Sequence, residues 1–505
     1  MSTQAVGQAE AVHDYGNFVA GDEVKSGTRS FLSHNPTTGK VWGRFVDSTA
    51  AEVATVVEAA YQAFKGPWAT LSPTRRGRLL MAWGAKIVAE ADRIAALETG
   101  QNGKLFAEMR AQLRAAEDWL VYFGGMADKV EGSVIPLDRT SVFNYTLREP
   151  LGVVAVIVPW NSPTFLTIMG IAPALAAGNT VVIKPSEVTS ASAIELAKLA
   201  VEAGIPPGVV NVVTGLREAG EALVAHPRVR KINFTGSDAG GRAIAAAAGK
   251  RLVSCVLELG GKSPNIVFAD ADLDRAEAGV LAGIFAAAGQ TCVAGSRAFI
   301  QRPVYDEMVQ RLTARAASIR VGDPMLAETQ MGPIATAAQL AKDESMVKKA
   351  VAEGAEVLHG GERLSLPQFP GGFFYAPTIL HRLSAENSLL RDEVFGPVLA
   401  VLPFDDEDEV VEAANRTEFG LASGVWTRDL RRAHMMARRL EAGTVWVNTY
   451  RAMAFNSPFG GYKDSGIGRQ NGIDTILQYT QTKSVWCELS EEVQDPFVLR
   501  TGGSR

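Results

Sequence analysis

Short apolar runs alternate with segments of helical periodicity from residue 151 onward. The apolar runs are rich in Val and Ile and lie at 153–158, 180–183, 209–213, 231–234 and 252–257. Between them, apolar residues recur at the spacing of amphipathic helices, which we expect from about 164 and at 191–203, 218–225 and 239–248. Repeated strand–helix–strand units predict a parallel sheet with helices on both faces.

The same alternation resumes further along the chain. Strands are expected at 265–268 and 298–301, and helices at 272–287 and 303–319. These elements predict a second α/β domain.

Two regions follow other patterns. Ala-rich amphipathic helices are expected at 51–65, 74–98 and 105–122, packed around the first sheet. The segments 141–148 and 482–489 alternate in side-chain character like exposed strands, so we expect them to pair with each other or with another subunit.

Length and charge narrow the class of protein. At 505 residues the chain exceeds what one hydrophobic core supports, so several domains are expected. A net charge of −5 without a Lys/Arg-rich run argues against a nucleic-acid partner. No apolar run approaches the ~20 residues of a membrane span. Residues 1–17 lack secretory or transit features, which predicts a cytoplasmic location.

Cysteine and histidine are sparse. Cys255, Cys292 and Cys487 are an odd number without close spacing, which argues against a disulfide framework. The six histidines are scattered without an i, i+4 pair or a nearby Cys, so no metal site is predicted. One of the cysteines is therefore a candidate reactive thiol.

Three polar side chains stand where chemistry is expected. Cys292 lies among small residues at the expected end of a helix, although a lone cysteine is more often an inert buried side chain. Glu258 ends an apolar strand, where a doubly wound sheet binds ligands, although it could equally cap a helix or pair with Lys262. Asn161 follows another strand end, where its amide can donate to an oxyanion. Together they suggest a nucleophile, a base and an oxyanion donor.

Asn161, Glu258 and Cys292, in this order, resemble the signature of the aldehyde dehydrogenase superfamily. The resemblance spans nearly the whole chain through four further motifs: Lys184-Pro185-Ser186-Glu187, Phe234-Thr235-Gly236-Ser237, Glu393-Val394-Phe395-Gly396-Pro397 and Pro458-Phe459-Gly460-Gly461-Tyr462-Lys463. It implies an α/β aldehyde dehydrogenase-like fold with three parts. These are a Rossmann-like NAD-binding domain (1–136 and 152–260), an α/β catalytic domain (261–464) and a small β oligomerisation element (137–151 and 480–497). A homodimer or homotetramer is implied as well.

The resemblance also implies a reaction, the NAD(P)-dependent oxidation of an aldehyde to its carboxylic acid. Cys292 would attack the aldehyde, with Asn161 and the Cys292 backbone N–H holding the oxyanion of the thiohemiacetal. Hydride transfer to nicotinamide leaves a thioester, and Glu258 activates the water that hydrolyses it. Because water is the acceptor, a CoA-acylating member of the family is not expected.

The cofactor site lacks a familiar fingerprint. No G-x-G-x-x-G follows the first strand, so the phosphate grip must differ from an ordinary Rossmann site. Gly236 and Ser237 open an expected helix whose N-terminal amides suit a pyrophosphate, although Ser237 also fits a plain N-cap. By resemblance, Lys184 and Glu187 hold the adenosine ribose, and Glu187 favours NAD over NADP because a carboxylate repels a 2′-phosphate. The other cofactor-binding positions implied are Trp160, Leu259, Glu393 and Phe395.

Four positions depart from the commoner family pattern. Ser162 stands where an aromatic residue often follows the Asn, and Ala287 replaces an Asn. Gly170 and Gln470 replace a Lys and a Glu that are thought to form a proton-relay ion pair. Losing both together avoids an unpaired buried charge, which costs about 3–5 kcal/mol, and predicts another route for proton release.

Seven substrate-lining positions are implied by the resemblance: Ser162, Phe165, Met169, Thr291, Val293, Met453 and Phe459. They include no Lys or Arg, which predicts a neutral aldehyde of modest size. Arg451 keeps one alternative open, an NADP-linked semialdehyde dehydrogenase with a cationic clamp. A non-catalytic binding or structural protein on the same scaffold is another alternative, against which the intact Cys292, Glu258 and Asn161 argue. The chain also resembles a bacterial branch that acts on aldehydes from the breakdown of heterocycles or lactones.

Overall fold

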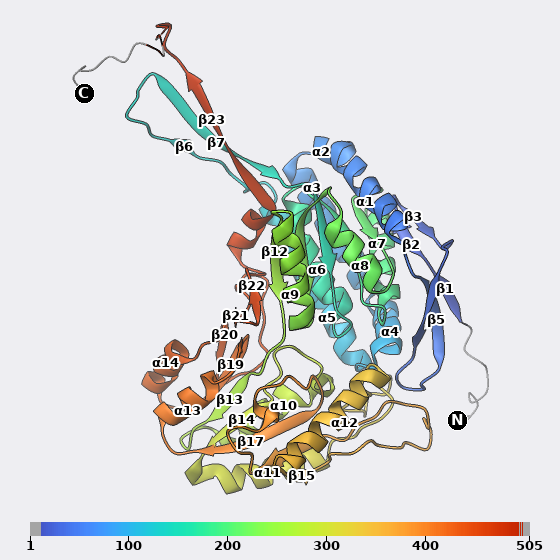
Figure 1. Ribbon diagram of the computed structural model, residues 1–505, viewed down its shortest axis with the longest axis vertical. Coiled ribbons are helices and arrows are strands. Elements are labelled where there is room, and N and C mark those ends of the chain that lie inside the picture. Colours follow the sequence, from blue (N-terminus) through green and yellow to red (C-terminus); the bar gives the residue numbers. More distant parts are fainter. Residues whose placement is uncertain (1–11, 494, 496, 498–505) are drawn as a thin grey trace.

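The strands in the described part of the chain form two large sheets and three small ones. The computed structural model describes residues 12–493, 495 and 497. The large sheets have eight and seven strands. Figure 1 shows the eight-stranded sheet with its helices in the upper part of the molecule, the seven-stranded sheet below it, and a narrow three-stranded sheet that extends away from both. The predicted α/β class is confirmed.

Five parallel strands make up the centre of the first sheet. They are β8 (Val153–Ile157), β9 (Thr180–Lys184), β10 (Val210–Val212), β11 (Val229–Thr235) and β12 (Ser254–Glu258). Their spatial order is β10-β9-β8-β11-β12. From β8 the chain adds β9 and β10 on one side and then β11 and β12 on the other, so the order of the strands switches between β8 and β11. A doubly wound sheet binds its ligands at this switch point, outside the carboxyl ends of the strands. Asn161 follows β8 and Ser237 follows β11, so both lie at that edge.

Helices cover both faces of this sheet, as the alternating pattern predicts. They are α1 (Ala50–Lys65), α3 (Pro73–Ala89), α4 (Ala91–Asn102), α5 (Phe106–Met126), α6 (Pro163–Ala176), α7 (Ser190–Glu202), α8 (Arg217–Ala225) and α9 (Asp238–Lys250). The single helix expected at 74–98 is wrong, because the chain breaks at Glu90 into α3 and α4. The apolar spacing runs on through Glu90, so the pattern gives no sign of the break.

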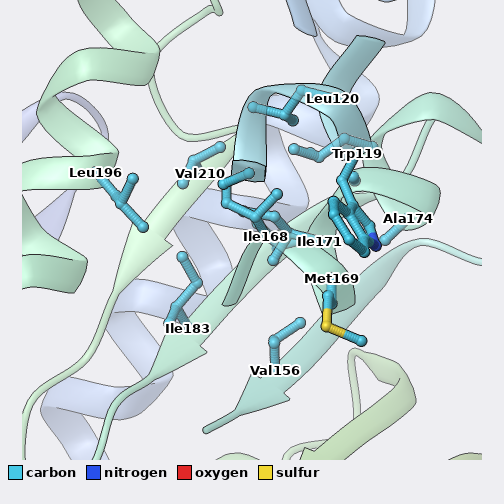
Figure 2. Close-up of a cluster of buried hydrophobic side chains, with 14 of the residues drawn as sticks. Trp119, Leu120, Val156, Ile168, Met169, Ile171, Ala174, Ile183, Leu196 and Val210 are labelled. Atoms are coloured by element: carbon cyan, nitrogen blue, oxygen red, sulfur yellow. The ribbon is translucent and has the colours of Figure 1, made fainter. Parts of the chain in front are cut away.

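The largest apolar core lies between this sheet and helices α5 and α6. Trp119 and Leu120 from α5 and Ile168 and Ile171 from α6 pack toward Val156 of β8 (Figure 2). All of them are buried, and the indole N–H of Trp119 donates to Asn471 Oδ1 at 2.7 Å. The core therefore fixes α6, whose first turn directly follows Asn161 and Ser162.

The second large sheet has six parallel strands and one antiparallel edge strand. In spatial order these are β15 (Glu356–His359), β16 (Thr378–His381), β17 (Val398–Phe404), β14 (Arg297–Gln301), β13 (Pro264–Val267), β19 (Ala422–Trp426) and β20 (Thr444–Val447). The edge strand is β15. Its helices are α10 (Leu273–Ile284), α11 (Tyr305–Ala317), α12 (Ala337–Ala352), α13 (Glu407–Asn415) and α14 (Leu430–Arg439). The helix expected at 272–287 ends early, at Ile284, because Ala287 and Ala288 adopt left-handed backbone angles.

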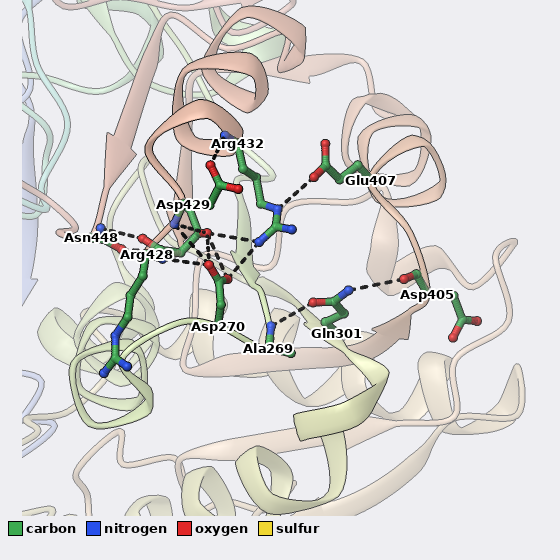
Figure 3. A network of polar contacts seen from close by, with 10 residues as sticks. Ala269, Asp270, Gln301, Asp405, Glu407, Arg428, Asp429, Arg432 and Asn448 are labelled. Carbon is green, nitrogen blue, oxygen red and sulfur yellow. Dashed lines mark hydrogen bonds and ion pairs between the residues drawn. The ribbon is translucent and has the colours of Figure 1, made fainter.

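A polar network around Asp270 ties the ends of this sheet to its helices (Figure 3). The carboxylate of Asp270 accepts from Thr427 Oγ1 at 2.9 Å and from Arg432 Nη1 at 2.9 Å. Arg432 also donates to Glu407 at 2.8 Å, and Thr427 exchanges two hydrogen bonds with the Asn448 amide. Asn448, with φ +53°, begins the loop that leads to Arg451, so the network anchors that loop.

The narrow sheet consists of β6 (Val134–Ile135), β7 (Val142–Pro150) and β23 (Thr480–Glu488). β7 and β23 pair antiparallel over nine residue pairs, which confirms the expectation that these two segments can pair with each other. The expected domain range 1–136 includes residues 1–11, and the expected strand range 480–497 includes residues 494 and 496. These residues lie outside the described part of the chain. None of the described helices is long and apolar enough to cross a membrane.

The remaining elements are short. They are β1 (His13–Tyr15), β2 (Asn17–Val19), β3 (Asp22–Val24), β4 (Ser30–His34), β5 (Val41–Val46), α2 (Pro67–Thr70), β18 (Phe419–Gly420), β21 (Tyr462–Lys463), β22 (Gly466–Ile467) and the 3₁₀ turns at Ala286–Gly289, Arg302–Val304, Ser388–Leu390 and Ile473–Tyr479.

Candidate active site

A cavity of about 170 Å³ opens at the switch point of the first sheet. It brings together eight of the residues that the sequence nominated: Trp160, Asn161, Gly236, Ser237, Leu259, Cys292, Glu393 and Phe395. Gln339 and Lys342 of α12 line the same cavity, and the sequence reasoning missed both. Their only sequence signal is an amphipathic helix, because their role depends on where α12 packs.

The loop that carries Cys292 has an unusual backbone. Ala287 (φ +58°), Ala288 (φ +52°) and Gly289 (φ +69°) are consecutive left-handed residues. A Cβ at Gly289 would lie 2.0 Å from the carbonyl oxygen of Gly396, so only glycine fits there. Asn tolerates a left-handed conformation better than Ala does, which is the physical reason an Asn would suit position 287.

Gln290 holds this loop in place. Its side chain is fully buried, accepts from the Ala335 backbone N–H at 2.9 Å, and donates to the carbonyl oxygens of Ala287 and Pro333 at 3.4 Å each. The hydrogen bonds of Gln290 therefore connect two parts of the nucleophile loop and also link the loop to the segment before α12.

The surroundings of Cys292 favour the thiol over the thiolate. Burial, followed by the charges of Glu393 and Glu258, raises the pKa of Cys292 to about 12, although the backbone N–H groups of Cys292 and Val293 oppose the shift. A thiol in this state becomes nucleophilic only when a base takes its proton or a positive charge approaches it.

Glu258 ends β12, and its side chain is buried. Both of its carboxylate oxygens are buried without a hydrogen-bond partner. Burial raises the pKa of Glu258 well above its usual value, and the charge of Arg469 only partly opposes this. A Cβ on Gly460 would lie 2.8 Å from Glu258 Oε1, so the glycine leaves room for the carboxyl group. Glu258 does not line the cavity itself, but its charge acts on Cys292.

The two glycines after Leu259 allow three segments to meet. A Cβ at Gly260 would lie 2.6 Å from Glu393 Oε2, and one at Gly261 would lie 2.4 Å from the carbonyl oxygen of Cys292. The Gly261 N–H donates to Glu393 Oε1 at 3.0 Å. Strand end, nucleophile loop and Glu393 can approach this closely only without side chains between them.

Asn161 faces the nucleophile loop from β8. Its Nδ2 donates to the carbonyl oxygen of Gln290 at 3.2 Å, while its Oδ1 is buried without a partner. Next to it, the rings of Trp160 and Phe395 meet edge to face with their centroids 5.4 Å apart, and both residues line the cavity. The Asn161 amide, the two aromatic rings and the Cys292 thiol thus lie around the same cavity.

A second cavity, of about 890 Å³, extends from the same sheet edge between α8 and α9. Lys184, Glu187 and Phe234 line it. Burial lowers the pKa of Lys184, whose Nζ donates to the Pro185 carbonyl at 2.9 Å. Ser237 caps α9 by accepting from the Gly240 N–H at 3.2 Å, so the plain N-cap interpretation holds, and this end of α9 still faces the cavity that Ser237 lines.

The predicted substrate-lining residues lie in several surroundings. Met169, Val293 and Phe459 belong to the first apolar core, and Phe165 packs against Trp119 at 4.8 Å. Ser162 and Thr291 are buried near the nucleophile loop. Met453 and Phe459 line a separate cavity of about 340 Å³.

The expectation of a lining without Lys or Arg stays a prediction, although a buried Lys lies beside one of the predicted positions, Ser162. Lys104 is buried, and its Nζ lies 3.5 Å from Ser162 Oγ. Lys104 follows the end of α4, and no local pattern connects it with Ser162, which is 58 residues away. Only the packing of α5, which begins two residues after Lys104, against α6 could reveal this contact.

A neutral network occupies the site of the missing ion pair. Gln470 Nε2 donates to Asn233 Oδ1 at 3.1 Å, and Asn233 Nδ2 donates to Tyr479 Oη at 2.7 Å. Tyr479 in turn donates to the carbonyl oxygen of Gly170 at 3.3 Å. A side chain at Gly170 would meet Val156 Cγ1 at 3.0 Å, so the site has closed around the glycine.

Comparison with known proteins places this geometry in context. A family model described as Aldehyde dehydrogenase family matches residues 24–485. A dehydrogenase of Acinetobacter baylyi, named for (Z)-2-((N-methylformamido)methylene)-5-hydroxybutyrolactone, is 44% identical over 95% of this chain and 98% of its own length.

Two solved structures are similar throughout. The NAD+ complex of an aldehyde dehydrogenase from Bacillus cereus is 38% identical with a TM-score of 0.92, over 95% of this chain and 97% of that one. A betaine aldehyde dehydrogenase from Staphylococcus aureus, in complex with NAD+, is 34% identical with a TM-score of 0.93, over 96% of this chain and 97% of that one. These neighbours confirm the fold that the motifs implied.

Proposed function

The chain belongs to the aldehyde dehydrogenase family, whose members oxidise aldehydes, and from this we propose that it uses NAD and a covalent intermediate on Cys292. The balanced reaction is aldehyde plus NAD+ plus water to carboxylic acid plus NADH plus a proton. The meeting of Cys292, Asn161 and Glu393 around one cavity at the switch point is the observation that carries the proposal.

In the first half of the reaction, the Sγ of Cys292 bonds to the aldehyde carbon. The thiol proton leaves to Glu258, whose raised pKa makes its carboxylate a stronger base than an ordinary Glu. The oxygen that becomes negative is held by Asn161 Nδ2 and the Cys292 backbone N–H. Bound NAD supplies the acceptor for the hydride that leaves this carbon, and the product is a thioester on Cys292.

In the second half, water attacks the thioester carbon and the Cys292 sulfur leaves. Glu258 must first release the thiol proton, and because Gly170 and Gln470 replace the relay pair, we propose that this proton leaves by another path. Glu258 then takes a proton from the attacking water, and its two unpartnered oxygens leave it free to do so. It returns this proton to the Cys292 sulfur as the acid departs, which restores the thiol.

The larger cavity suits the adenosine half of NAD. Glu187 is exposed at its wall, and a carboxylate there disfavours a 2′-phosphate. NADP remains the alternative cofactor, because Arg217 lines the same cavity. Measuring the ratio of activity with NAD to that with NADP decides between them.

The name of the Acinetobacter relative suggests a second candidate substrate. A five-membered lactone with a hydroxyl on the ring carbon next to the ring oxygen opens to a molecule with an aldehyde and a carboxylate. We propose that this chain accepts such a hydroxylactone through its open form.

We also propose that the predicted division into domains holds, and that the narrow sheet serves oligomerisation. Exposed apolar side chains, among them Val134, Leu147 and Trp486, lie on that sheet, and Trp486 is 63% exposed. Light scattering coupled to gel filtration should give a dimer or a tetramer, and Trp486→Lys should shift the mass toward the monomer. A monomeric wild type would contradict this part of the proposal.

The function itself is tested by following NADH or NADPH absorbance with aliphatic, aromatic, hydroxylated and carboxylated aldehydes. We expect turnover with NAD, and none for Cys292→Ala, although that variant should still bind NAD. Turnover by Cys292→Ala would refute the covalent mechanism.

A further inference from the structure

Lys104, Glu108 and Arg451 form a buried charge cluster beside the nucleophile, to which the proposed reaction gives no role. Lys104 Nζ lies 3.7 Å from Glu108 Oε1, and Arg451 Nη2 lies 3.3 Å from the same oxygen. The side chains of Lys104, Glu108 and Arg451 are 1%, 20% and 24% exposed, respectively. Two cations therefore share a single carboxylate oxygen in a largely shielded place.

The cluster borders the reacting atoms on two sides. Lys104 contacts Ser162, the residue after the proposed oxyanion donor Asn161. Tyr450, the neighbour of Arg451, donates from Oη to the carbonyl oxygen of Val293, the residue after Cys292. The field of a Cys292 thiolate also reaches the Lys104 ammonium. The cluster therefore lies next to residues that flank both Asn161 and Cys292.

The charges in this cluster do not balance. Burial works against ionisation of Glu108, but Lys104 and Arg451 outweigh it and hold the pKa of Glu108 below its usual range. Glu98 also faces Lys104, but burial raises its pKa to about 7 and it is engaged with the Thr164 N–H at 2.9 Å. Two cationic side chains thus face one ionised carboxylate, and burial lowers the pKa of Lys104. An anion that joins the cluster would stabilise the charged form of Lys104.

The backbone supports a function for Arg451. Its φ of +62° lies in the left-handed region, which a side chain as large as Arg seldom occupies, and the Asp270 network anchors the loop before it. Strain of this kind is retained where the surrounding structure enforces it, commonly at ligand sites.

We propose that Lys104 and Arg451 bind a carboxylate at the far end of the substrate, so that the preferred substrates are semialdehydes, with Glu108 holding both cations until the substrate arrives. An Arg fork and a Lys ammonium are the donors that suit a carboxylate. This inference rests on the proposed oxidation at Cys292. It reverses the expectation of a neutral aldehyde and leaves the choice between NAD and NADP untouched.

A matched pair of substrates tests the proposal. Succinic semialdehyde and its methyl ester differ by one negative charge at the far end. The wild type should prefer the acid by about tenfold or more in kcat/KM, as a charge-assisted contact predicts. In Lys104→Met and in Arg451→Gln the ratio of acid to ester should fall toward one, mainly through a higher KM for the acid. Glu108→Gln should lower the KM for the acid, because it frees both cations.

The controls separate recognition from folding. Arg302→Gln removes an exposed Arg whose partner is Asp405, and the acid-to-ester ratio should not change. Should Lys104→Met fail to fold, Arg451→Gln and Glu108→Gln still carry the test, because both positions are partly exposed. Wild-type oxidation of both substrates with equal kcat/KM would overturn the proposal, and so would equal losses on both in the variants. Oxidation of neither substrate, nor of any other aldehyde, would instead refute the proposed function.

Discussion

The side-chain amide of Asn161 donates to the carbonyl oxygen of Gln290 at 3.2 Å, two residues before Cys292. Asn161 follows β8 of the first sheet, and Gln290 belongs to the loop that leads into β14 of the second. One hydrogen bond thus joins the two sheets at the nucleophile. The position of Cys292 depends on this contact between the sheets, and its pKa depends on its burial and on Glu393 and Glu258.

Gln290→Ala should loosen the nucleophile loop. The substitution removes one buried acceptor and two buried donors, leaving the Ala335 N–H without its partner. We expect a loss of about 1–3 kcal/mol in the free energy of unfolding and a drop of about tenfold or more in kcat. Urea unfolding and steady-state kinetics measure the two effects. Gln62→Ala on the exposed face of α1 is the control, and equal behaviour of the two variants would count against the role of Gln290.

Ala287→Gly should stabilise the protein. Ala287 has φ +58° and ψ +24°, a conformation that costs an L-residue roughly 1–2 kcal/mol and glycine little. We expect a gain of about 1 kcal/mol in unfolding free energy, and a smaller gain for Ala287→Asn. Ala286→Gly, at a neighbouring position without a positive φ, should instead destabilise. A loss of stability in Ala287→Gly would show that the left-handed turn is not formed in solution.

Gly261→Ala should impair catalysis while the fold persists. The new Cβ would lie 2.4 Å from the carbonyl oxygen of Cys292, so the nucleophile loop must shift. Because a displacement of about 1 Å can cost roughly a hundredfold in rate, we expect kcat to fall by one to two orders of magnitude, about tenfold at least. Gly249→Ala is the matched control, since its Cβ would meet no atom within 4 Å. Unchanged kinetics in Gly261→Ala would contradict the described close approach.

Alkylation of Cys292 should be slow and strongly dependent on pH. Because burial and the nearby Glu393 and Glu258 raise the pKa of Cys292 to about 12, the thiolate fraction grows steadily as pH rises above neutrality. Iodoacetamide labelling in a Cys255→Ser/Cys487→Ser background should show no plateau near the ordinary thiol pKa of about 8.5. NAD should accelerate labelling, because its positive nicotinamide ring favours the thiolate. A plateau near pH 8.5 without NAD would contradict this electrostatic account.

The sequence predicts the sheets well because their strands are buried on both faces. Apolar residues fill most of Val153–Ile157 and Thr180–Lys184, as is typical of strands in a covered parallel sheet. Both segments are strands, and they pair with each other in parallel. The strand ends then bring Asn161 and Ser237 to one edge, as the winding order requires.

What the sequence does not predict depends on tertiary packing or on backbone strain. The break at Glu90 and the left-handed turn at Ala287 interrupt helical patterns that continue in the sequence. Lys104 is buried by a contact with Ser162 that no local spacing encodes. The charge cluster consists of Lys104 between α4 and α5, Glu108 in α5 and Arg451 in a distant loop. Only the folded structure brings these three residues together.

The most direct test of the central claim is intact-mass and peptide-mass analysis of Glu258→Gln after mixing with an aldehyde and NAD. This variant retains the nucleophile, whose thiolate is still favoured by bound NAD and by alkaline pH, but it lacks the base that releases the acid. We therefore predict a slowed burst of NADH and an acyl group on the peptide that contains Cys292. Cys292→Ala with Glu258→Gln should show neither. Continued NADH turnover with no adduct, or an adduct on Cys255 or Cys487, would contradict the account.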